Sequence, residues 1–405
     1  MFFTKSSDEK LYLAIRMKIL VLTSRFPWPL EKGDKLRVYH QIRMLSLKHE
    51  IILCSLTEQS IAEKHFQELE KYCTNIYLFP ISRLSIGANL VKGLLKGDSL
   101  QISWFYRGSI LKQIREIVKK ETPDHLYCQL IRMSEYGRRI DLPRTLDIMD
   151  CFSIGMDRRA DESPFWLKPF FRREAKKLRQ YEANILSHFD YLTIISEQDR
   201  DLIQSPQRQK IQVIPNGIDL AYFQPDPKQK PVYDLVFVGN MGYSPNVIAA
   251  GFLVKKVMPL IWASYPDTTL LLAGARPVPA VKALEKDSRV AVSGWVENIR
   301  DAYQNGKIFV APLFTGSGQQ NKIIEAMALE VPCITTPLVN NAIGAKVNEE
   351  ILIADSDQGF AQQILDLLAD HKLRHKLSQN GRAFVSKNFS WEESVEKLNE
   401  IWEAR

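Results

Sequence analysis

The spacing of apolar and polar positions along the chain switches repeatedly between two patterns. From Met17 onward, short apolar runs rich in Val, Ile, Leu and Phe alternate with segments whose apolar positions recur at the 3.6-residue period of a helix. This alternation is typical of parallel sheets with helices on both faces. The pattern therefore predicts an α/β protein built from doubly wound, Rossmann-like sheets.

The strand-like runs fall into two groups, which predict two sheets. The first group is 18–24, 51–56, 75–80, 125–130, 145–150, 191–196 and 211–215, and the second is 233–239, 269–274, 289–294, 308–313, 332–336 and 351–355. A chain of 405 residues is long enough for two domains.

Composition places the domain boundary between these two groups. Residues 216–231, NGIDLAYFQPDPKQKP, follow no period and are rich in Pro and polar residues, so we expect a linker there. The predicted N-terminal domain is then 17–215, the predicted C-terminal domain is 232–388, and a final helix occupies 389–405. Residues 1–16 lack the features of a signal peptide and are expected to be a flexible extension.

Charge and cysteine content narrow the function classes. Residues 1–230 carry a formal excess of nine positive charges, whereas 231–405 carry an excess of two negative charges, so only the first half is suited to anionic partners. The five cysteines are odd in number and form no CxxC pair, which argues against zinc sites and disulfides and favours a reducing cytoplasm. No uninterrupted apolar run approaches the roughly 20 residues of a membrane span.

A carboxylate stands inside an apolar helical run of the second domain. Glu325 lies within Ile323–Ala328, although an ionised group against apolar neighbours costs several kcal/mol unless it is hydrogen-bonded. Lys322 shares its helix face one turn earlier, and the small residues Thr315–Gly318 precede the helix. Backbone N–H groups at such a helix start suit a diphosphate, while the carboxylate suits ribose hydroxyls. The alternative is an exposed Lys322–Glu325 ion pair worth tenths of a kcal/mol.

Several segments together resemble one enzyme family. GSGQQNKIIEAMALEVPCITT (316–336) is accompanied by the segments 24–45, 170–199, 213–225, 238–253, 292–303 and 389–395, so that the resemblance spans nearly the whole chain from Met17. These segments resemble the retaining, family-four glycosyltransferases of the GT-B fold. Within that family they are similar to the sugar transferases associated with exosortase (PEP-CTERM) exopolysaccharide systems.

The resemblance implies a fold, an activity and partners. The fold is GT-B, with two Rossmann-like domains facing across a cleft and a C-terminal helix returning to the N-domain. The activity is retaining, metal-independent transfer of a sugar from a nucleotide-diphospho-sugar, which is the donor substrate and not a cofactor, to a glycan or lipid-linked acceptor in cell-surface or exopolysaccharide synthesis. We expect no nucleic-acid partner and a cytoplasmic protein, with peripheral contact to an anionic inner membrane face left open.

The same resemblance implies donor-binding residues in the second domain. Glu325 matches the carboxylate that holds the donor ribose, Lys322 matches a cation near the diphosphate, and the phosphate cradle is Gly316, Ser317 and Gly318. Trp295 and Val296 match the loop that packs against the nucleobase. Two departures stand out: Ser317 replaces a carboxylate of many relatives, and the predicted donor loop at Gly239 and Asn240 lacks their Arg and Lys clamp.

Candidates in the first domain lie after strand-like runs. The resemblance implies that Gly33 lets main chain approach the donor, and Asp34 is predicted to cap a helix from Lys35. Arg37 is expected to face the cleft and to supply missing positive charge, which makes it a catalytic candidate together with Lys322. Asp150, at the end of run 145–150, is the third catalytic candidate, and its alternative role is capping the next helix.

Segment 163–182, SPFWLKPFFRREAKKLRQYE, mixes large apolar residues with cations. One interpretation is a membrane-surface contact; the other, which we favour for most of its aromatic residues, is a helix that packs them in the core. Two further functions stay open, a nucleotide-sugar epimerase of GT-B architecture and a non-catalytic nucleotide-sugar-binding protein.

Overall fold

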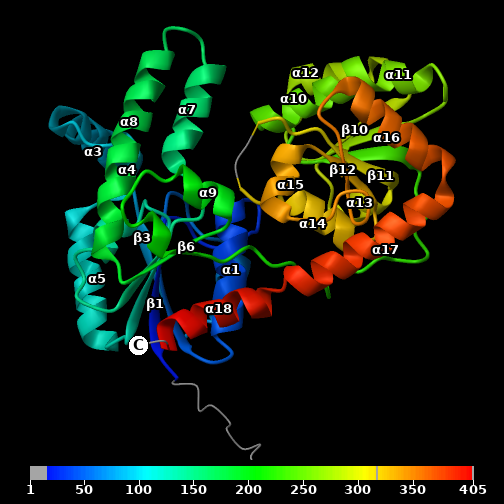
Figure 1. The fold of residues 1–405 in the computed structure, drawn as a ribbon. Helices are drawn as coiled ribbons and strands as arrows, with labels where there is room; N and C mark the ends of the chain where they lie inside the picture. Colours follow the sequence, from blue (N-terminus) through cyan, green and yellow to red (C-terminus); the bar gives the residue numbers. More distant parts are fainter. Residues whose placement is uncertain (1–15, 316–317, 404–405) are drawn as a thin grey trace, which may run out of the picture. The chain divides into compact units, whose positions relative to one another are not determined.

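The computed structural model describes residues 16–315 and 318–403, which form two compact units, each built on one sheet (Figure 1). Unit 1 comprises the residues up to Thr193 together with Ile203–Gln212, and unit 2 comprises Ile194–Leu202 together with the chain from Val213 onward. The predicted linker and the last helix therefore belong to unit 2. Segment Ile194–Leu202, which we placed in the N-terminal domain, also clusters with unit 2.

Unit 1 contains a seven-stranded sheet in the order β3-β2-β1-β4-β5-β6-β7, in which the strand pairs from β3 to β6 run parallel. The strands are β1 (Lys18–Thr23), β2 (Glu50–Thr57), β3 (Asn75–Pro80), β4 (His125–Gln129), β5 (Arg144–Asp147), β6 (Tyr191–Ile194) and β7 (Ile211–Val213). The helices are α1 (Gly33–Leu45), α2 (Glu63–Glu70), α3 (Arg83–Lys96), α4 (Leu100–Phe105), α5 (Gly108–Glu121), α6 (Ser134–Gly137), α7 (Phe152–Glu162) and α8 (Lys168–Ile185), with 3₁₀ turns η1 (Leu186–His188) and η2 (Arg208–Lys210).

Unit 2 contains a six-stranded parallel sheet in the order β10-β9-β8-β11-β12-β13. The strands are β8 (Tyr233–Val238), β9 (Leu270–Ala273), β10 (Val290–Gly294), β11 (Gly306–Ala311), β12 (Cys333–Thr335) and β13 (Leu352–Ile353). The helices are α9 (Glu197–Leu202), α10 (Ser244–Phe252), the π-helix η3 (Leu253–Val257), α11 (Met258–Trp262), α12 (Pro279–Lys282), the 3₁₀ turn η4 (Ala283–Lys286), α13 (Ile299–Gln304), α14 (Asn321–Ala328), α15 (Pro337–Ile343), α16 (Asp357–Ala369), α17 (His371–Asn388) and α18 (Trp391–Glu403).

Strand order fixes where each unit can bind a ligand. The order reverses between β1 and β4 in unit 1 and between β8 and β11 in unit 2. At such a switch point the loops that follow the two strands diverge and leave a crevice beyond their carboxyl ends. The site of each unit is therefore expected where the loops after these central strands lie.

The predicted fold class is confirmed, because each of the thirteen predicted runs contains a strand and both sheets are doubly wound. One local prediction is wrong. Helix α1 begins at Gly33, so Asp34 lies in its first turn and caps nothing. Helices α16 and α17 are separated at Asp370, whose carboxylate accepts from the N–H groups of Lys372 and Leu373 and caps α17. That the C-terminal helix returns to the N-domain stays a prediction.

One helical segment, Ser244–Trp262, is long and apolar enough to cross a membrane by length and composition. Our expectation of no such segment was based on uninterrupted runs, and Lys255 and Lys256 interrupt this one. Its buried residues, including Leu253, Val257 and Ile261, belong to the hydrophobic core of unit 2. The segment is thus a core helix in this fold.

Helices α7 and α8 form a hairpin (Figure 1), and aromatic residues in its turn and at the start of α8 are exposed. The side chains of Phe165, Trp166 and Phe170 are 78%, 66% and 49% exposed. The prediction that most aromatic residues of this segment lie in the core is therefore wrong for these three. The physical reason is that the helices pack along their length on each other and leave the turn between them unpartnered.

Arg37 forms a buried ion pair inside unit 1, contrary to our expectation that it faces a ligand. Its guanidinium donates to the Asp147 carboxylate with Nε–Oδ2 2.7 Å and Nη2–Oδ1 2.9 Å, and both side chains are completely buried. The Thr193 hydroxyl donates to the same carboxylate at 2.8 Å. Burial alone would lower the pKa of Arg37, but Asp147 raises it. Arg37 thus joins α1 to the carboxyl end of β5.

We predict that Arg37→Met destabilises the protein by about 3–5 kcal/mol, because it leaves the Asp147 carboxylate buried without a counter-charge. Urea unfolding followed by circular dichroism measures the change. The double variant Arg37→Met/Asp147→Leu should recover most of the loss. Arg25→Met is the matched control, since its partly exposed pair with Asp34 contributes less than about 1 kcal/mol. Equal losses for Arg37→Met and Arg25→Met would contradict this account.

Candidate functional site

Helix α14 begins in the loop after β11, at the switch point of the unit 2 sheet. Its apolar side chains Ile323, Ile324 and Met327 are at most 2% exposed and pack in the core. Lys322 and Glu325 lie on the remaining face and are partly buried. Gly316 and Ser317, predicted as part of the phosphate cradle, lie outside the described residues.

Glu325 is held by a tyrosine from the core. The hydroxyl of Tyr303, on α13, donates to Glu325 Oε2 at 2.6 Å, and Tyr303 is 1% exposed. Burial raises the pKa of Glu325, while the Tyr303 hydrogen bond and the nearby Lys322 oppose that rise. Among the described residues, the Tyr303 hydroxyl donates to Oε2 of this carboxylate, so Oε1 can accept from a ligand.

Lys322 is held by an amide rather than by an acid. Its Nζ donates to Asn246 Oδ1 at 2.6 Å and lies 5.3 Å from the centre of the Phe237 ring. Asn246 is in turn fixed by donating from Nδ2 to the Asn240 carbonyl at 3.0 Å. Burial lowers the pKa of Lys322 to about 8, and Glu325 opposes the shift.

The alternative interpretation, an exposed Lys322–Glu325 ion pair, does not describe this arrangement. Each charge is partly buried and is hydrogen-bonded to a different neutral partner. An ammonium and a carboxylate one turn apart are therefore desolvated and oriented without being paired. This arrangement leaves both of them able to bind a ligand that carries both acceptors and donors, such as a phosphate group linked to a hydroxylated ring.

Glycines at the carboxyl ends of neighbouring strands bring backbone close to this edge. A Cβ on Gly274, whose φ is +137°, would lie 1.9 Å from the Gly239 carbonyl oxygen, so glycine is required there. A Cβ on Gly239 would lie 2.7 Å from Asn246 Nδ2. Gly294, with φ +68°, ends β10. The loops after β8, β9 and β10 thus present main chain to one edge of the sheet.

The other donor-binding candidates of unit 2 lie at this same edge. Asn240 follows β8, and its Oδ1 accepts from the Gly242 N–H at 3.0 Å. Trp295 and Val296 directly follow β10; Trp295 is 72% exposed, whereas Val296 packs on the core. A ring so exposed on a glycine-led loop is available to a planar ligand.

The loop before α14 is supported by residues that we did not predict. The Gln319 side chain accepts from the Asn216 N–H and donates to the Asn216 carbonyl, both at 2.9 Å. Gly318 has φ +74°, and a Cβ there would lie 3.2 Å from Oδ2 of the buried Asp199. A side chain at Gly318 is therefore disfavoured by its backbone conformation.

In unit 1, Gly33 and its neighbours lie at the start of α1. A Cβ on Gly33 would meet no atom within 4 Å, so packing inside the protein does not explain this glycine. Asp34 pairs with Arg25 at 2.7 Å instead of capping the helix. Gln129, at the end of β4, donates to the Asp34 carbonyl at 2.5 Å. These contacts join the loops after β1 and β4 across the switch point.

Asp150 and Arg132 lie in the loops after β5 and β4, and the Asp150 carboxylate is one of the charges that act to raise the pKa of Arg132. Burial is the larger effect and lowers the Arg132 pKa to about 10. The Arg132 guanidinium lies between the rings of Phe105 and Phe152, 5.1 and 4.8 Å from their centres. Cys151 is the N-cap residue of α7 and makes no side-chain cap bond, while the Ser153 N–H in the first turn donates to Glu182 Oε1 at 3.0 Å. The alternative role for Asp150 as a helix cap stays a prediction.

Backbone strain marks the same edge of unit 1. Leu130 and Met149 have φ of +66° and +67°, and each follows shortly after a central strand. Non-glycine residues in the left-handed region are uncommon and cluster at functional sites. Asp150 and Arg132 are thus held on strained loops at the switch point of this sheet.

Sequence reasoning missed Tyr303, Asn246 and Arg25 as members of these sites. Tyr303 closes the quoted segment 292–303 and Asn246 lies in 238–253, so the segments were recognised while these roles were not. Among the described residues, no cluster of three or more His, Cys, Asp and Glu side chains is arranged to hold a metal ion. The five cysteines are buried and form no disulfide within the described residues.

Part of the chain is similar to a known protein family. Residues 232–370 match the family model described as glycosyl transferases group 1. A 44.6 kDa protein in the cps region of Klebsiella pneumoniae is 24% identical over 390 residues, which cover 92% of this chain and 96% of that protein. The capsular polysaccharide biosynthesis glycosyltransferase CapM of Staphylococcus aureus is 41% identical over 202 residues, covering 45% of this chain and 53% of CapM.

Solved structures agree in fold. Sucrose-phosphate synthase from Thermosynechococcus elongatus has a TM-score of 0.71 at 16% identity and covers 96% of this chain and 99% of its own. Anabaena HepE, in complex with UDP and glucose, has a TM-score of 0.67 at 15% identity and covers 96% of this chain and 100% of its own. At these identities the likeness concerns the fold alone. Residues 232–370 are thus similar to the glycosyl transferases of group 1, and the two parallel-sheet units have the GT-B fold.

Proposed function

We propose that the protein transfers a sugar from a nucleotide-diphospho-sugar to a glycan or lipid-linked acceptor, with retention of anomeric configuration and without a metal ion. Unit 2 binds the donor at α14, and unit 1 binds the acceptor at its switch point. The observation that carries the proposal is the pair Lys322 and Glu325, desolvated one turn apart and held by Asn246 and Tyr303. The products are expected to enter cell-surface glycan synthesis, including exopolysaccharide systems of the exosortase type.

Each residue has a defined part in the proposed reaction. The glycosidic bond to the diphosphate breaks while the acceptor oxygen bonds to the same face of the anomeric carbon, and the departing diphosphate takes the acceptor's proton. Lys322 and the N–H groups at the start of α14 stabilise the charge that develops on the diphosphate. Glu325 accepts from the ribose hydroxyls. Asp150 and Arg132 orient the acceptor or the sugar.

Relatives support the type of donor. HepE is described with UDP and glucose, and an Escherichia coli relative is named as a UDP-Gal:α-D-GlcNAc-diphosphoundecaprenol α-1,3-galactosyltransferase. We therefore propose a UDP-sugar as the first donor to test. Trp295 and Val296 are the proposed base contacts, Gly239 and Asn240 contact the donor, and Gly33 is the proposed point of main-chain approach from unit 1.

A turnover assay distinguishes the proposed transferase from two other functions. An epimerase would consume the donor without an acceptor, and a non-catalytic binding protein would bind the donor without turnover on any acceptor. The departure at Ser317 from the carboxylate of many relatives is the sequence feature that favours the binding protein. Release of UDP that depends on an added acceptor supports the transferase alone.

We also propose a cytoplasmic protein that contacts the inner membrane face through the tip of the α7–α8 hairpin. Phe165 and Trp166 are more than half exposed there, and the helices that follow carry Lys176 and other cations. Aromatic residues and cations together suit an anionic membrane interface.

We predict that Glu325→Gln and Lys322→Gln each weaken UDP-glucose or UDP binding by about 10–100-fold, because each removes a charge-assisted hydrogen bond. Isothermal calorimetry measures the affinity. Glutamine at 325 still accepts from Tyr303, so the thermal midpoint should change little. Glu330→Gln and Lys346→Gln, on exposed sites of unit 2, are matched controls and should bind normally. Unfolding of the two site variants with unimpaired binding would contradict the proposal.

We predict that UDP affinity falls about tenfold as the pH rises from 7 to 9. The pKa of Lys322 is about 8, so its ammonium is present at pH 7 and mostly lost at pH 9, and the anionic diphosphate binds the protonated form. Calorimetry across this range measures the slope, and Lys322→Gln should remove it. An identical slope in the variant would assign the pH effect to another group.

We predict that Phe165→Ser/Trp166→Ser lowers partition onto phosphatidylglycerol vesicles by about tenfold, because two exposed rings no longer enter the interface. Co-sedimentation measures the bound fraction. Val232→Ser/Tyr265→Ser removes two exposed apolar side chains from unit 2 and serves as control. Undiminished partition of the hairpin variant would eliminate the hairpin as the contact.

A further inference from the structure

A pocket of about 690 Å³ lies in unit 1 and is lined by α3, α4, α6, α8 and the start of α5. Helix α4 separates it from the switch-point site. The α4 residues Gln101 and Phe105 contact Arg132 on one side, whereas Ile102 and Ser103 line the pocket on the other. The pocket is therefore distinct from the acceptor site proposed above.

Basic side chains dominate the pocket lining. Two carboxylates, Asp98 and Glu135, face six cationic side chains, which gives a formal excess of four positive charges. The cations are Lys92, Lys96, Arg107, Arg138, Arg139 and Lys177. They come from several separate elements, so the fold gathers like charges that sequence neighbours alone would not bring together.

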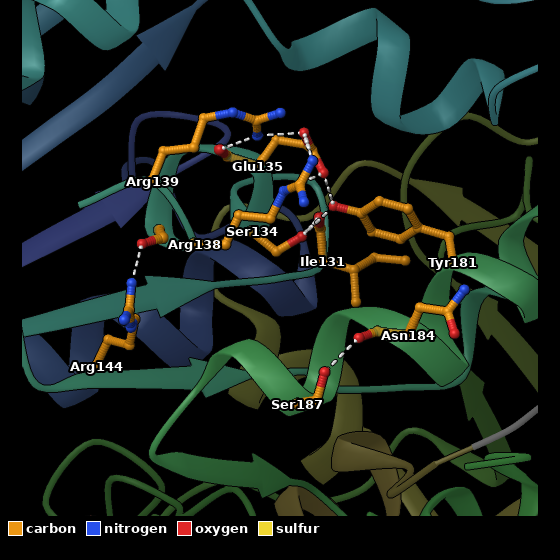
Figure 2. Close-up of polar contacts among 10 residues, drawn as sticks. Ile131, Ser134, Glu135, Arg138, Arg139, Arg144, Tyr181, Asn184 and Ser187 are labelled. Carbon is orange, nitrogen blue, oxygen red and sulfur yellow. Dashed lines mark hydrogen bonds and ion pairs between the residues drawn. The ribbon is translucent and has the colours of Figure 1, made fainter. Parts of the chain in front are cut away.

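Glu135 is already occupied by its own neighbours and cannot neutralise the rest. Arg138 Nε lies 2.9 Å from Glu135 Oε1, and the Tyr181 hydroxyl donates to the same oxygen at 2.8 Å (Figure 2). Arg139 Nη1 forms an ion pair with Glu135 Oε2. Within residues 16–315 and 318–403, the ion pairs of the structure include none for Lys92, Lys96 or Lys177. Three ammonium groups thus face the pocket without a protein carboxylate.

Two further features add positive potential. The 14-residue helix α5 begins in the pocket with Gly108 and Ser109, and its N-cap residue Arg107 makes no side-chain cap bond, so the positive end of the helix dipole points into the pocket. The Arg107 guanidinium donates to the carbonyls of Ser103, Trp104 and Tyr106 at 3.3, 3.0 and 2.8 Å. Its charge is held in place by neutral groups.

We propose that this pocket binds a phosphate-bearing ligand. The positive charges that these helices bring together repel one another. A bound anion with several acceptor oxygens relieves this repulsion, because it accepts hydrogen bonds from ammonium groups and helix N–H groups at the same time. The phosphate can belong to a soluble compound or to a lipid headgroup. The surface of helix α3 favours a lipid headgroup as the source of the phosphate. Leu84, Val91 and Leu95 form one apolar stripe there and are 87%, 61% and 84% exposed beside Lys92 and Lys96.

The acetylation rate of each lysine measures whether a ligand binds in the pocket itself. The full-length protein is acetylated briefly with and without inorganic phosphate, and mass spectrometry gives the rate at each lysine. We expect labelling of Lys92, Lys96 and Lys177 to slow by about threefold at a ligand concentration of twice the Kd. Lys64, Lys112 and Lys119 are exposed in unit 1 outside the pocket, and their rates should not change.

A second arm distinguishes the two sources of phosphate. Dihexanoyl phosphatidylglycerol, kept below its micelle concentration, replaces inorganic phosphate, and dihexanoyl phosphatidylcholine is the control lipid. If both inorganic phosphate and the anionic lipid protect the pocket lysines from acetylation, the pocket is a general phosphate site. Protection by the anionic lipid alone identifies a headgroup site. Either result supports the pocket as a phosphate site.

Variants test whether the pocket acts as a unit. Lys96→Gln/Lys177→Gln should remove the protection of Lys92, whereas the charge-matched Lys112→Gln/Lys119→Gln should leave it intact. These side chains are at least partly exposed, so folding should be retained, which circular dichroism checks. Absence of protection by every probe, or equal protection of the control lysines, would overturn the proposal.

Discussion

Desolvation of two opposite charges on α14 is the constraint on which the unit 2 site depends. Burial raises the pKa of Glu325 and lowers the pKa of Lys322, so the surroundings oppose the charged form of both groups. Mutual pairing would relieve this cost, yet each group is bonded to a neutral residue instead. Tyr303 and Asn246 are themselves buried, which fixes the positions of both charges by core packing. A ligand with a phosphate and vicinal hydroxyls meets groups that are already oriented.

Parallel sheets supply the rest of the geometry through main chain. Because all carboxyl ends lie on one edge, the loops after β8, β9 and β10 converge there, and glycine lets them approach one another. Gly274 is required by its positive φ and by the nearness of the Gly239 carbonyl. Gly33 has no such internal requirement.

The sequence predicted what depends on local pattern and missed what depends on strand order. Strand runs were recognisable because buried parallel strands are continuously apolar, and Lys322 with Glu325 was recognisable from one helical turn of spacing. Tyr303 and Asn246 lie 22 and 76 residues from their partners, and only the sheet brings them together. Arg37 was misplaced for the same reason, since its partner Asp147 is 110 residues away. Helical period also could not show that the hairpin tip lacks a packing partner.

Part of the positive charge of the N-terminal half gathers in two regions of unit 1. Arg25 and Arg132 lie at the switch-point edge, and the lysines of the pocket lie beyond α4. Helix α4 is held firmly, because the buried Glu174 of α8 accepts from the Ser99 hydroxyl at 2.6 Å and from the Leu100 and Gln101 N–H groups at 3.0 and 2.9 Å. Gln101 also accepts from Arg132 at 3.2 Å. A short helix with one side in each basic region therefore keeps two like-charged sites apart, and a shift of α4 would change both of them together.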